Sequence, residues 1–344
     1  MLFIKKLCAW LVMLLICSCL FGIYTVKAGQ NDVSVYEVTV DNLIYKVDMQ
    51  KVTATVTSAK SKKIKKIVIP DTIVYEETEI PVEAVADYAF FESKKLKSAV
   101  IGCNVKSIGE AAFAFSLKLK KVSIPEEVEE IGDAAFAGCS ILKSSGIGKN
   151  TKLKRIGAGA FAGTAFKSFT IPDYTDIVGA AVFNGCGKLK KIYIGTNCEV
   201  IGEGAFSGCD KLTTVSLSKY NRSFNIIDGV IYNADCSKLV SAAAADGELT
   251  VPDGVLCILP YAFEDESRII SVILPDSLTD IEENAFLNAE GLEHISFGLG
   301  LKRIGLNAFY GCSGLKTVEL QMGEDKIEGY PFLDTDDGIQ VIQG

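Results

Sequence analysis

Histidine is nearly missing from this sequence, since its 344 residues include a single one, His294. A Ser/His/Asp or Cys/His catalytic arrangement would have to use this residue. His294 comes directly before Ile295 in a segment of alternating apolar residues, so we expect its side chain to face away from a core. The scarcity of histidine argues against nucleophilic hydrolase chemistry, and the sequence predicts no enzyme.

Motifs for metals and phosphates are missing as well. No Cys-x-x-Cys pair occurs, which argues against a structural zinc site. Gly146-Ile147-Gly148-Lys149 lacks the spacing of a phosphate-binding loop and the Ser or Thr that should follow the lysine. The acidic segment 334–338 lacks the alternating ligands of a calcium loop. We therefore expect no cofactor and no metal.

An excess of basic charge is also absent. The chain has 35 Lys and Arg residues against 43 Asp and Glu residues, for a formal net charge of −8. Residues 1–28 contain three lysines and no acid, so their removal would take the net charge from −8 to −11. A nucleic-acid partner would favour a basic surface, and the sequence predicts no such partner.

Long apolar runs are confined to the N-terminus. Lys5 and Lys6 precede an apolar run from Leu7 to Ile23, and Val26 and Ala28 fit the small-residue rule for signal cleavage. No later stretch approaches the roughly 18 apolar residues that span a bilayer. We therefore predict a secreted or cell-surface protein without a membrane span once its signal peptide has been removed.

Two alternatives to a cleaved signal peptide over residues 1–28 stay open. A lipoprotein signal would end at Cys19, but Ile16-Cys17-Ser18-Cys19 is a poor lipobox and apolar residues continue beyond it. The run could also be kept as a membrane anchor.

The dominant feature of the sequence is an internal repeat. The pair Ala-Phe, once Val-Phe, recurs at spacings of 22 to 25 residues with one gap of 57. An aliphatic residue stands five positions before each Phe, and another large apolar residue stands about six positions after it. The repeated phenylalanines are Phe90, Phe113, Phe136, Phe161, Phe183, Phe206, Phe263, Phe286 and Phe309.

Each repeat also contains a short alternating segment, such as Val122-Ser123-Ile124, which Pro125 closes. Alternation over a short run indicates a strand with one buried face. A coil of this length is too small to bury its own Phe and Leu, so successive coils must stack. We therefore predict a mainly β solenoid with about eleven short parallel strand rungs. Between the Ile-Gly and Ala-Phe positions we expect a short helical or 3₁₀ turn.

The repeat resembles the BspA-type leucine-rich repeat, the treponemal or bacterial-surface class of that superfamily. The resemblance rests on Ile131-Gly132-Asp133-Ala134-Ala135-Phe136-Ala137-Gly138-Cys139, on Leu119-Lys120-Lys121-Val122-Ser123-Ile124-Pro125, and on their counterparts over residues 64–321. It implies a right-handed leucine-rich-repeat coil and a surface or secreted protein linked to adhesion. The sequence departs from this pattern at Ser145, which takes a core strand position, and it has no cell-wall sorting signal at its end.

Segments outside the repeat predict caps and an insert. Residues 29–63 alternate without the repeat and are expected to form an N-terminal β cap, because an open solenoid end exposes core. Residues 221–247 predict an inserted β-hairpin, since Asp228-Gly229 between apolar runs is a strong turn signal. Residues 322–344 are expected to close the last rung as a flap.

Eleven cysteines occur, and eight remain after removal of the predicted signal peptide. An even number in an exported chain suggests disulfides. Four of the cysteines, however, recur three residues after a repeat Phe, where a small side chain would pack in a ladder. These four, Cys139, Cys186, Cys209 and Cys312, are expected to be reduced and buried. Cys186 and Cys209 lie on neighbouring coils, so this pair is the one that could bridge.

Function in a solenoid generally depends on the outward strand face. Aromatic and cationic side chains are the best anchors there, and we select Lys121, Lys191, Tyr193 and, less strongly, His294. The first three are expected on neighbouring or near-neighbouring rungs. A column of lysines before the strands (Lys95, Lys118, Lys188, Lys211) is interpreted as a solubilising ridge.

Three functions remain open on the sequence alone. The first is a non-catalytic binding or adhesion module that contacts an unidentified host or surface protein or glycan. The second is a structural protein that assembles with its own copies, and the third is an enzyme of unfamiliar type.

The cleavage site gives the first testable prediction. N-terminal sequencing of the exported chain should begin near Gly29, because Val26 and Ala28 fit a signal-peptidase site. A mature chain that starts with a lipid-modified Cys19 would contradict this prediction.

Overall fold

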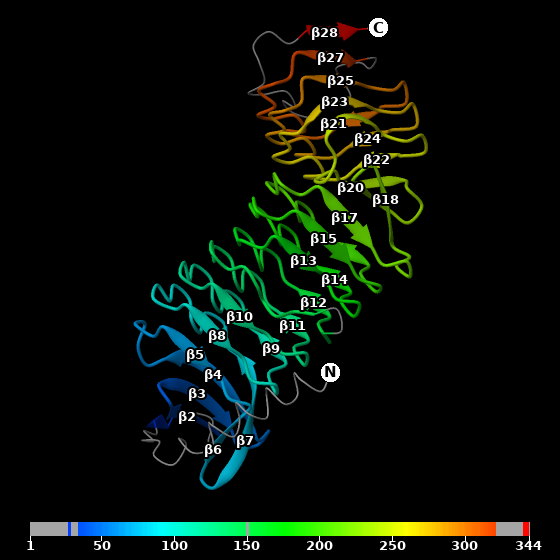
Figure 1. The fold of residues 1–344 in the computed structure, drawn as a ribbon. Coiled ribbons are helices and arrows are strands. Elements are labelled where there is room, and N and C mark those ends of the chain that lie inside the picture. Colours follow the sequence, from blue (N-terminus) through cyan, green and yellow to red (C-terminus); the bar gives the residue numbers. More distant parts are fainter. Residues whose placement is uncertain (1–26, 29–33, 149–150, 321–339, 344) are drawn as a thin grey trace.

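The computed structural model describes residues 27–28, 34–148, 151–320 and 340–343 and shows a β-solenoid (Figure 1). Over these residues the chain consists of strands and turns and contains no helix. Successive coils stack so that equivalent strands lie side by side and pair in parallel. The predicted solenoid is therefore confirmed.

The strands predicted from the alternating segments form the first ladder of the solenoid. They pair in parallel within three sheets of three, three and five strands. The total of eleven equals the predicted number of rungs, but it includes residues 340–343, which were expected in a flap, and lacks a strand at Ser145. The strands are β5 (Lys66–Val68), β8 (Ser98–Val100), β10 (Lys121–Ser123), β13 (Ser168–Thr170), β15 (Lys191–Ile194), β17 (Thr214–Leu217), β21 (Gly247–Thr250), β23 (Ile269–Ile273), β25 (His294–Ser296), β27 (Thr317–Leu320) and β28 (Gln340–Gln343).

The first interruption of this ladder falls at the coil that carries Ser145. This coil has no assigned strand, although the N–H groups of Val122 and Ile124 still donate to the carbonyls of Ser144 and Ser145 at 3.1 and 2.9 Å. Ser145 is buried at the position that other coils fill with a large apolar residue. The polar residue therefore weakens the regular strand without breaking the stack.

A second parallel ladder runs along another side of the solenoid, and sequence analysis missed it. Each of its regular strands is only two residues long and ends on the aliphatic residue that stands five positions before Phe. These strands are β9 (Ser107–Ile108), β11 (Glu130–Ile131), β12 (Arg155–Ile156), β14 (Ile177–Val178), β16 (Val200–Ile201), β22 (Cys257–Ile258), β24 (Asp280–Ile281) and β26 (Arg303–Ile304).

The Ala-Phe side consists of turns, so the predicted helical or 3₁₀ turn was wrong. In one central coil, the N–H groups of Ala134, Phe136 and Gly138 donate to carbonyls of the next coil at 2.7, 2.8 and 2.8 Å. A helix would use these donors within its own coil. Ala134 and Gly138 have φ values of 53° and 68°, which lie outside the helical region. Every second N–H group thus pairs between coils, whereas those of Ala135, Ala137 and Cys139 donate to the carbonyl three residues back, at 3.3, 2.9 and 3.2 Å, in turns that form no helix.

The repeated phenylalanines form a buried column in each half of the solenoid, from Phe90 to Phe206 and from Phe263 to Phe309. All nine are 2% exposed or less, and the rings of Phe113 and Phe136 stack at 5.1 Å with planes 5° apart.

The close approach of coils explains the glycine that follows the aliphatic residue in most repeats. A Cβ on Gly132 would lie 2.7 Å from the backbone nitrogen of Glu110 in the preceding coil. A side chain at that point would push the coils apart.

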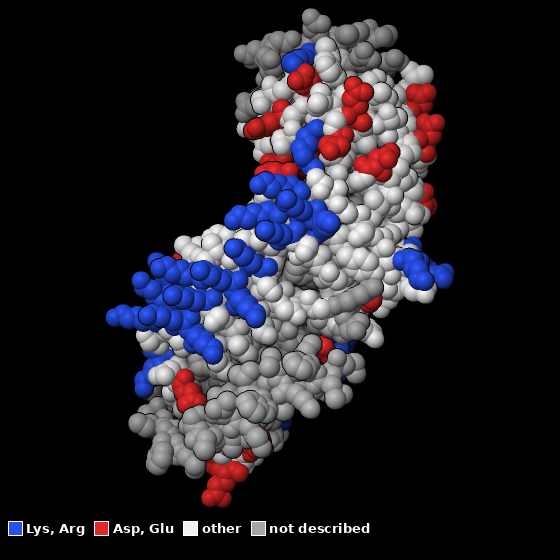
Figure 2. All heavy atoms as spheres, viewed as in Figure 1, with Lys and Arg blue, Asp and Glu red and all other residues white. Residues whose placement is uncertain are grey.

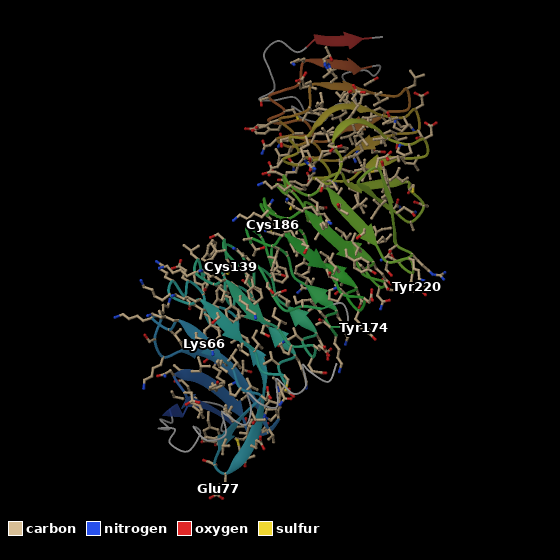
Figure 3. All side chains as sticks on the ribbon, in the orientation of Figure 1. Lys66, Glu77, Cys139, Tyr174, Cys186 and Tyr220 are labelled. Carbon is tan, nitrogen blue, oxygen red and sulfur yellow. The ribbon has the colours of Figure 1, made fainter. Side chains whose placement is uncertain are left out.

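An antiparallel sheet caps the first coil, as predicted. Its strands β2 (Val35–Val40), β3 (Leu43–Asp48) and β4 (Thr53–Ala59) follow one another, and β4 then pairs in parallel with the solenoid. Sequence analysis missed a hairpin in the first coil, formed by β6 (Thr72–Tyr75) and β7 (Thr78–Val85). Its tip is Glu76-Glu77, where both residues have positive φ. The hairpin projects from the N-terminal end of the molecule (Figure 3, label Glu77).

The predicted inserted hairpin is present as β18 (Phe224–Ile227) and β19 (Val230–Asn233). Asp228 and Gly229 have φ values of 48° and 78°, as the mirror-image turn of a tight hairpin requires. A third strand, β20 (Lys238–Ser241), pairs antiparallel with β19 and parallel with β22, and so returns the chain to the second ladder.

The insert separates two hydrophobic cores. Within β19, Ile231 belongs to the core of the N-terminal half, whereas Val230 and Tyr232 belong to that of the C-terminal half. Figure 1 shows that the solenoid axis bends where the insert lies. Alternate side chains of β19 therefore pack into different cores, one in each half of the solenoid.

Both chain ends fall largely outside the described residues. Of the predicted signal peptide, only Lys27 and Ala28 are described, and they form β1, which pairs antiparallel with β2. Most of the flap predicted for 322–344 also lies outside the described residues. Its described part, β28, pairs in parallel with β27 and adds a rung to the ladder.

The phenylalanine column provides a stability prediction. Phe136→Ala should lower the free energy of unfolding by about 3–5 kcal/mol, as truncation of a buried Phe does. Phe115→Ala serves as a matched control, because Phe115 is 50% exposed two residues after a repeat Phe. Denaturant unfolding of both variants would measure the difference. Equal losses would contradict the assignment of the column as core.

Candidate binding surface

The outward face of β15 brings two of the predicted binding residues together. Lys191 is exposed and Tyr193 is half-buried, whereas Ile192 and Ile194 are buried. Residues two apart on a strand point to the same face. Lys191 and Tyr193 therefore form one pair on the outward surface.

Lys121 lies farther from this pair than the sequence analysis expected. It is exposed at the start of β10 and occupies the same position in its coil as Lys191. Two coils lie between them, which contribute Ser144 and Ser168 at this position. At about 4.8 Å per rung, Lys121 and Lys191 stand roughly 14 Å apart along the ladder. A ligand that contacts both must therefore be extended.

The structure does not bring His294 to the other three residues. It lies in β25, on the far side of the insert. Its Nδ1 is 2.7 Å from the hydroxyl of Thr317, and its Nε2 is 3.9 Å from a carboxylate oxygen of Glu293. The second distance exceeds a hydrogen bond, so the carboxylate does not orient the ring as a catalytic acid–base would require. The imidazole lies on the exposed face of its strand, where a ligand could contact it.

The four repeat cysteines act as hydrogen-bond donors between coils. The Sγ atoms of Cys139, Cys186, Cys209 and Cys312 each donate to the carbonyl of the repeat Phe in the preceding coil, at 3.2, 3.2, 3.2 and 3.0 Å. Ser116 makes the same bond to Phe90 with its hydroxyl, at 3.2 Å. This position was expected only to pack a small side chain, and it also satisfies a buried carbonyl.

Burial keeps these thiols protonated. Desolvation raises the pKa of Cys139 and of Cys312 to about 12, and it also raises the pKa of Cys186 and Cys209. All four are free and buried, as predicted, and Cys186 is not bridged to Cys209. A thiolate is the nucleophilic and metal-binding form of cysteine, so neither chemistry suits this ladder.

A buried charged pair fills the joint between the two solenoid halves. Glu266 occupies the position of the repeat cysteines in the coil after the insert, and its burial raises its pKa to about 7. Arg268 donates to the carbonyls of Leu212 and Ala243 at 2.7 and 2.6 Å and lies 3.5 Å from Glu266. These bonds tie backbone from the N-terminal half and the insert to the C-terminal half.

Charges along the second ladder are paired from coil to coil. Lys106 contacts Glu83 at 2.6 Å, Lys154 contacts Glu129 at 2.7 Å, and Lys152 contacts Glu127 at 2.7 Å (these six side chains all face solvent). Opposite charges on neighbouring strands stabilise a sheet modestly. On this side of the molecule, these basic side chains are thus neutralised by acidic side chains of neighbouring coils.

A third set of lysines lies just before the first-ladder strands, and sequence analysis missed it. Each member directly follows a large apolar residue, which is Ile64 in the first coil and the repeat Leu or Phe in the others, and all are exposed. We name this set the lysine row, and it consists of Lys65, Lys97, Lys120, Lys143, Lys167 and Lys190. The signal was visible in the sequence as a lysine at one fixed repeat position. Figure 2 shows Lys and Arg gathered along one edge of the N-terminal half, and more acids on the C-terminal half.

Two ladders of parallel strands and a buried phenylalanine column define the class of this molecule as a leucine-rich-repeat solenoid. The family model for the BspA type leucine rich repeat region matches residues 58–164, 145–243 and 247–342. The chain therefore belongs to the BspA-type leucine-rich-repeat family, as its repeat predicted.

Solved structures of bacterial repeat proteins are similar over most of the chain. A leucine rich cell surface protein from Faecalibacterium prausnitzii is 26% identical, with a TM-score of 0.63 over 89% of this chain and 88% of that one. The pneumococcal vaccine antigen PcpA is 19% identical, with a TM-score of 0.62 over 90% and 88%. A leucine-rich repeat protein from Bacteroides ovatus is 22% identical, with a TM-score of 0.54 over 89% and 90%.

A search of curated proteins gave no match. Among the described residues, none belongs to a helix of the length and apolarity that a bilayer crossing requires. Over the same residues, no three His, Cys, Asp or Glu side chains are grouped as a metal ion would need.

The thiol ladder can be tested by labelling. Cys103 is exposed and should react quickly in the native chain, whereas the four ladder cysteines should react only after unfolding. Timed alkylation followed by mass spectrometry would measure both rates, and Cys103→Ser should remove the fast phase. Detection of a Cys186–Cys209 disulfide would contradict the proposed ladder.

Proposed function

We propose that this chain is a non-catalytic binding protein, secreted or held at the cell surface, which contacts a protein or glycan through its outward strand face. The observation that carries the proposal is the register of the first ladder. Lys191 pairs with Ser168 and Thr214, and Tyr193 pairs with Thr170 and Ser216. Side chains at equivalent positions therefore form straight rows that an extended ligand can follow.

The surface location is supported by two observations. The Faecalibacterium prausnitzii protein, which is 26% identical over most of both chains, is described as a cell surface protein. The basic start and apolar run before Gly29 favour export.

Substitution of Lys121, Lys191 and Tyr193 together by Ala should weaken attachment to host matrix or glycan preparations at least tenfold. Hot spots favour aromatic and cationic anchors, and none of the three lies in the buried core. Attachment of the immobilised chain would be measured by surface plasmon resonance, with circular dichroism as the check of folding.

The matched control replaces Lys106, Lys152 and Tyr174, which are the same residue types, are exposed and lie away from the outward strand face. It should retain wild-type attachment. A folded triple variant at Lys121, Lys191 and Tyr193 that attaches as well as wild type would refute the strand-face assignment. Concentration-dependent polymer growth in light scattering would instead favour the alternative, a self-assembling structural protein.

A further inference from the structure

The lysine row places like charges on six coils, in one run of four paired neighbours and one run of two. The N–H groups of Lys97, Lys120 and Lys143 donate to the carbonyls of Lys65, Lys97 and Lys120 at 2.8, 3.0 and 3.1 Å, so these residues are direct neighbours. Lys190 donates to Lys167 in the same way at 2.9 Å. At about 4.8 Å per coil, six members extend over about 24 Å.

This arrangement does not stabilise the fold. Like charges that stand opposite one another on neighbouring strands are destabilising. Among the described residues, no carboxylate lies within ion-pair distance of any member of the row, although other lysines of the chain are paired. The N–H groups of Lys97, Lys120, Lys143 and Lys190 already donate to the preceding coil, so these lysines do not protect an open strand edge.

Further lysines flank the row on both sides. One flank lies on the outward strand face and the other lies on the turn that precedes the row, and all members are exposed. The flanking lysines are Lys66, Lys121, Lys191, Lys95, Lys118, Lys188 and Lys211. In later coils the row position carries Thr213, Ile270, Glu293 and Lys316. Lys316 is paired with Glu293 at 2.6 Å, so the lysines of this position that lack an ion pair all belong to the N-terminal half.

We propose that the lysine row and its flanks bind a linear sulfated polysaccharide that lies along the solenoid axis. This inference rests on the proposed binding function and assigns a ligand class to it. Lysine ammonium groups act as point charges without the fixed geometry of arginine, and they suit sulfate groups on a flexible chain. Because the row continues from coil to coil, a longer polysaccharide makes contact with more lysines, and it does not need to adopt a specific conformation to do so.

Other polyanions fit the surface less well. Proteins that bind single-stranded nucleic acid stack successive bases on aromatic side chains. The exposed aromatic residues of the described chain, Tyr88, Phe115, Tyr174 and Tyr220, belong neither to the row nor to its flanks. Tyr193, beside Lys191, is half-buried and offers a single ring.

The test compares two triple variants of equal charge. Lys97→Gln, Lys120→Gln and Lys143→Gln remove half of the row, whereas Lys106→Gln, Lys152→Gln and Lys154→Gln remove three exposed lysines from ion pairs of the second ladder. Each chain, without its predicted signal peptide, is titrated against dextran sulfate and against uncharged dextran at several salt concentrations.

Wild type should bind dextran sulfate but not dextran. Its affinity should fall roughly 10²–10³-fold between about 50 and 200 mM salt, since six contacts release counterions. The row variant should bind at least tenfold more weakly and lower the log–log salt slope by about 2–3. The second-ladder variant should keep both the affinity and the slope of wild type.

Equal weakening by the two variants, or no binding of dextran sulfate by folded wild type, would overturn the proposal. Tighter row-dependent binding of single-stranded DNA or of anionic vesicles at equal charge would also overturn it and would reassign the surface. Failure of the sulfated-ligand proposal can be told apart from failure of the proposed binding function. Matrix attachment that survives the row variant but is lost on substitution of Lys121, Lys191 and Tyr193 would contradict the sulfated ligand alone.

Discussion

Backbone pairing between successive coils is the constraint on which the rest of the structure depends. No coil is large enough to enclose its own Phe and Leu, so each coil uses its neighbours as the other side of its core. Pairing occurs on both ladders and again on the Ala-Phe side, where Ala134, Phe136 and Gly138 donate to the next coil. Glycine at 132, the Phe column and the hydrogen-bonding cysteines all follow from this close approach. Equivalent outward residues also fall into rows for this reason, and both binding proposals depend on those rows.

The insert shows how the stack tolerates an interruption. The coil between Phe206 and Phe263 lacks the Ala-Phe half, so the column is broken and the two cores are separate. Strand β19 packs one face on each core, β20 restores the second ladder, and Arg268 bonds to backbone on the other side of the gap. The bend in Figure 1 lies at this joint, and the lysine row ends at Lys190, with Thr213 at the row position in the last coil before the insert. The insert therefore divides the molecule into two surfaces of different charge.

Much of the fold could be predicted because its signals are local and repeated. Ala-Phe at fixed spacing predicted the stacked coils, and Asp228-Gly229 predicted the hairpin. The turns could not be predicted, since the positive φ of Ala134 depends on a carbonyl in the next coil, and no local signal favours it. Strands of two residues, such as Glu130–Ile131, are too short to show alternation. The Glu76-Glu77 turn lacks the Gly or Asn that usually marks such a hairpin. For the surface, the sequence predicted which residue types face outward. It did not predict how far Lys121 lies from Lys191, because that distance depends on the number of coils between them.

Residue-resolved hydrogen–deuterium exchange tests the central claim most directly. If pairing between coils holds the turns, the amides of Ala134, Phe136 and Gly138 should exchange as slowly as that of Val122, which donates to Ser144 of the next coil at 3.1 Å. All four amides would then open only when coils separate. Exchange of the three turn amides at the rate of solvent-exposed turns, with Val122 still protected, would contradict the account.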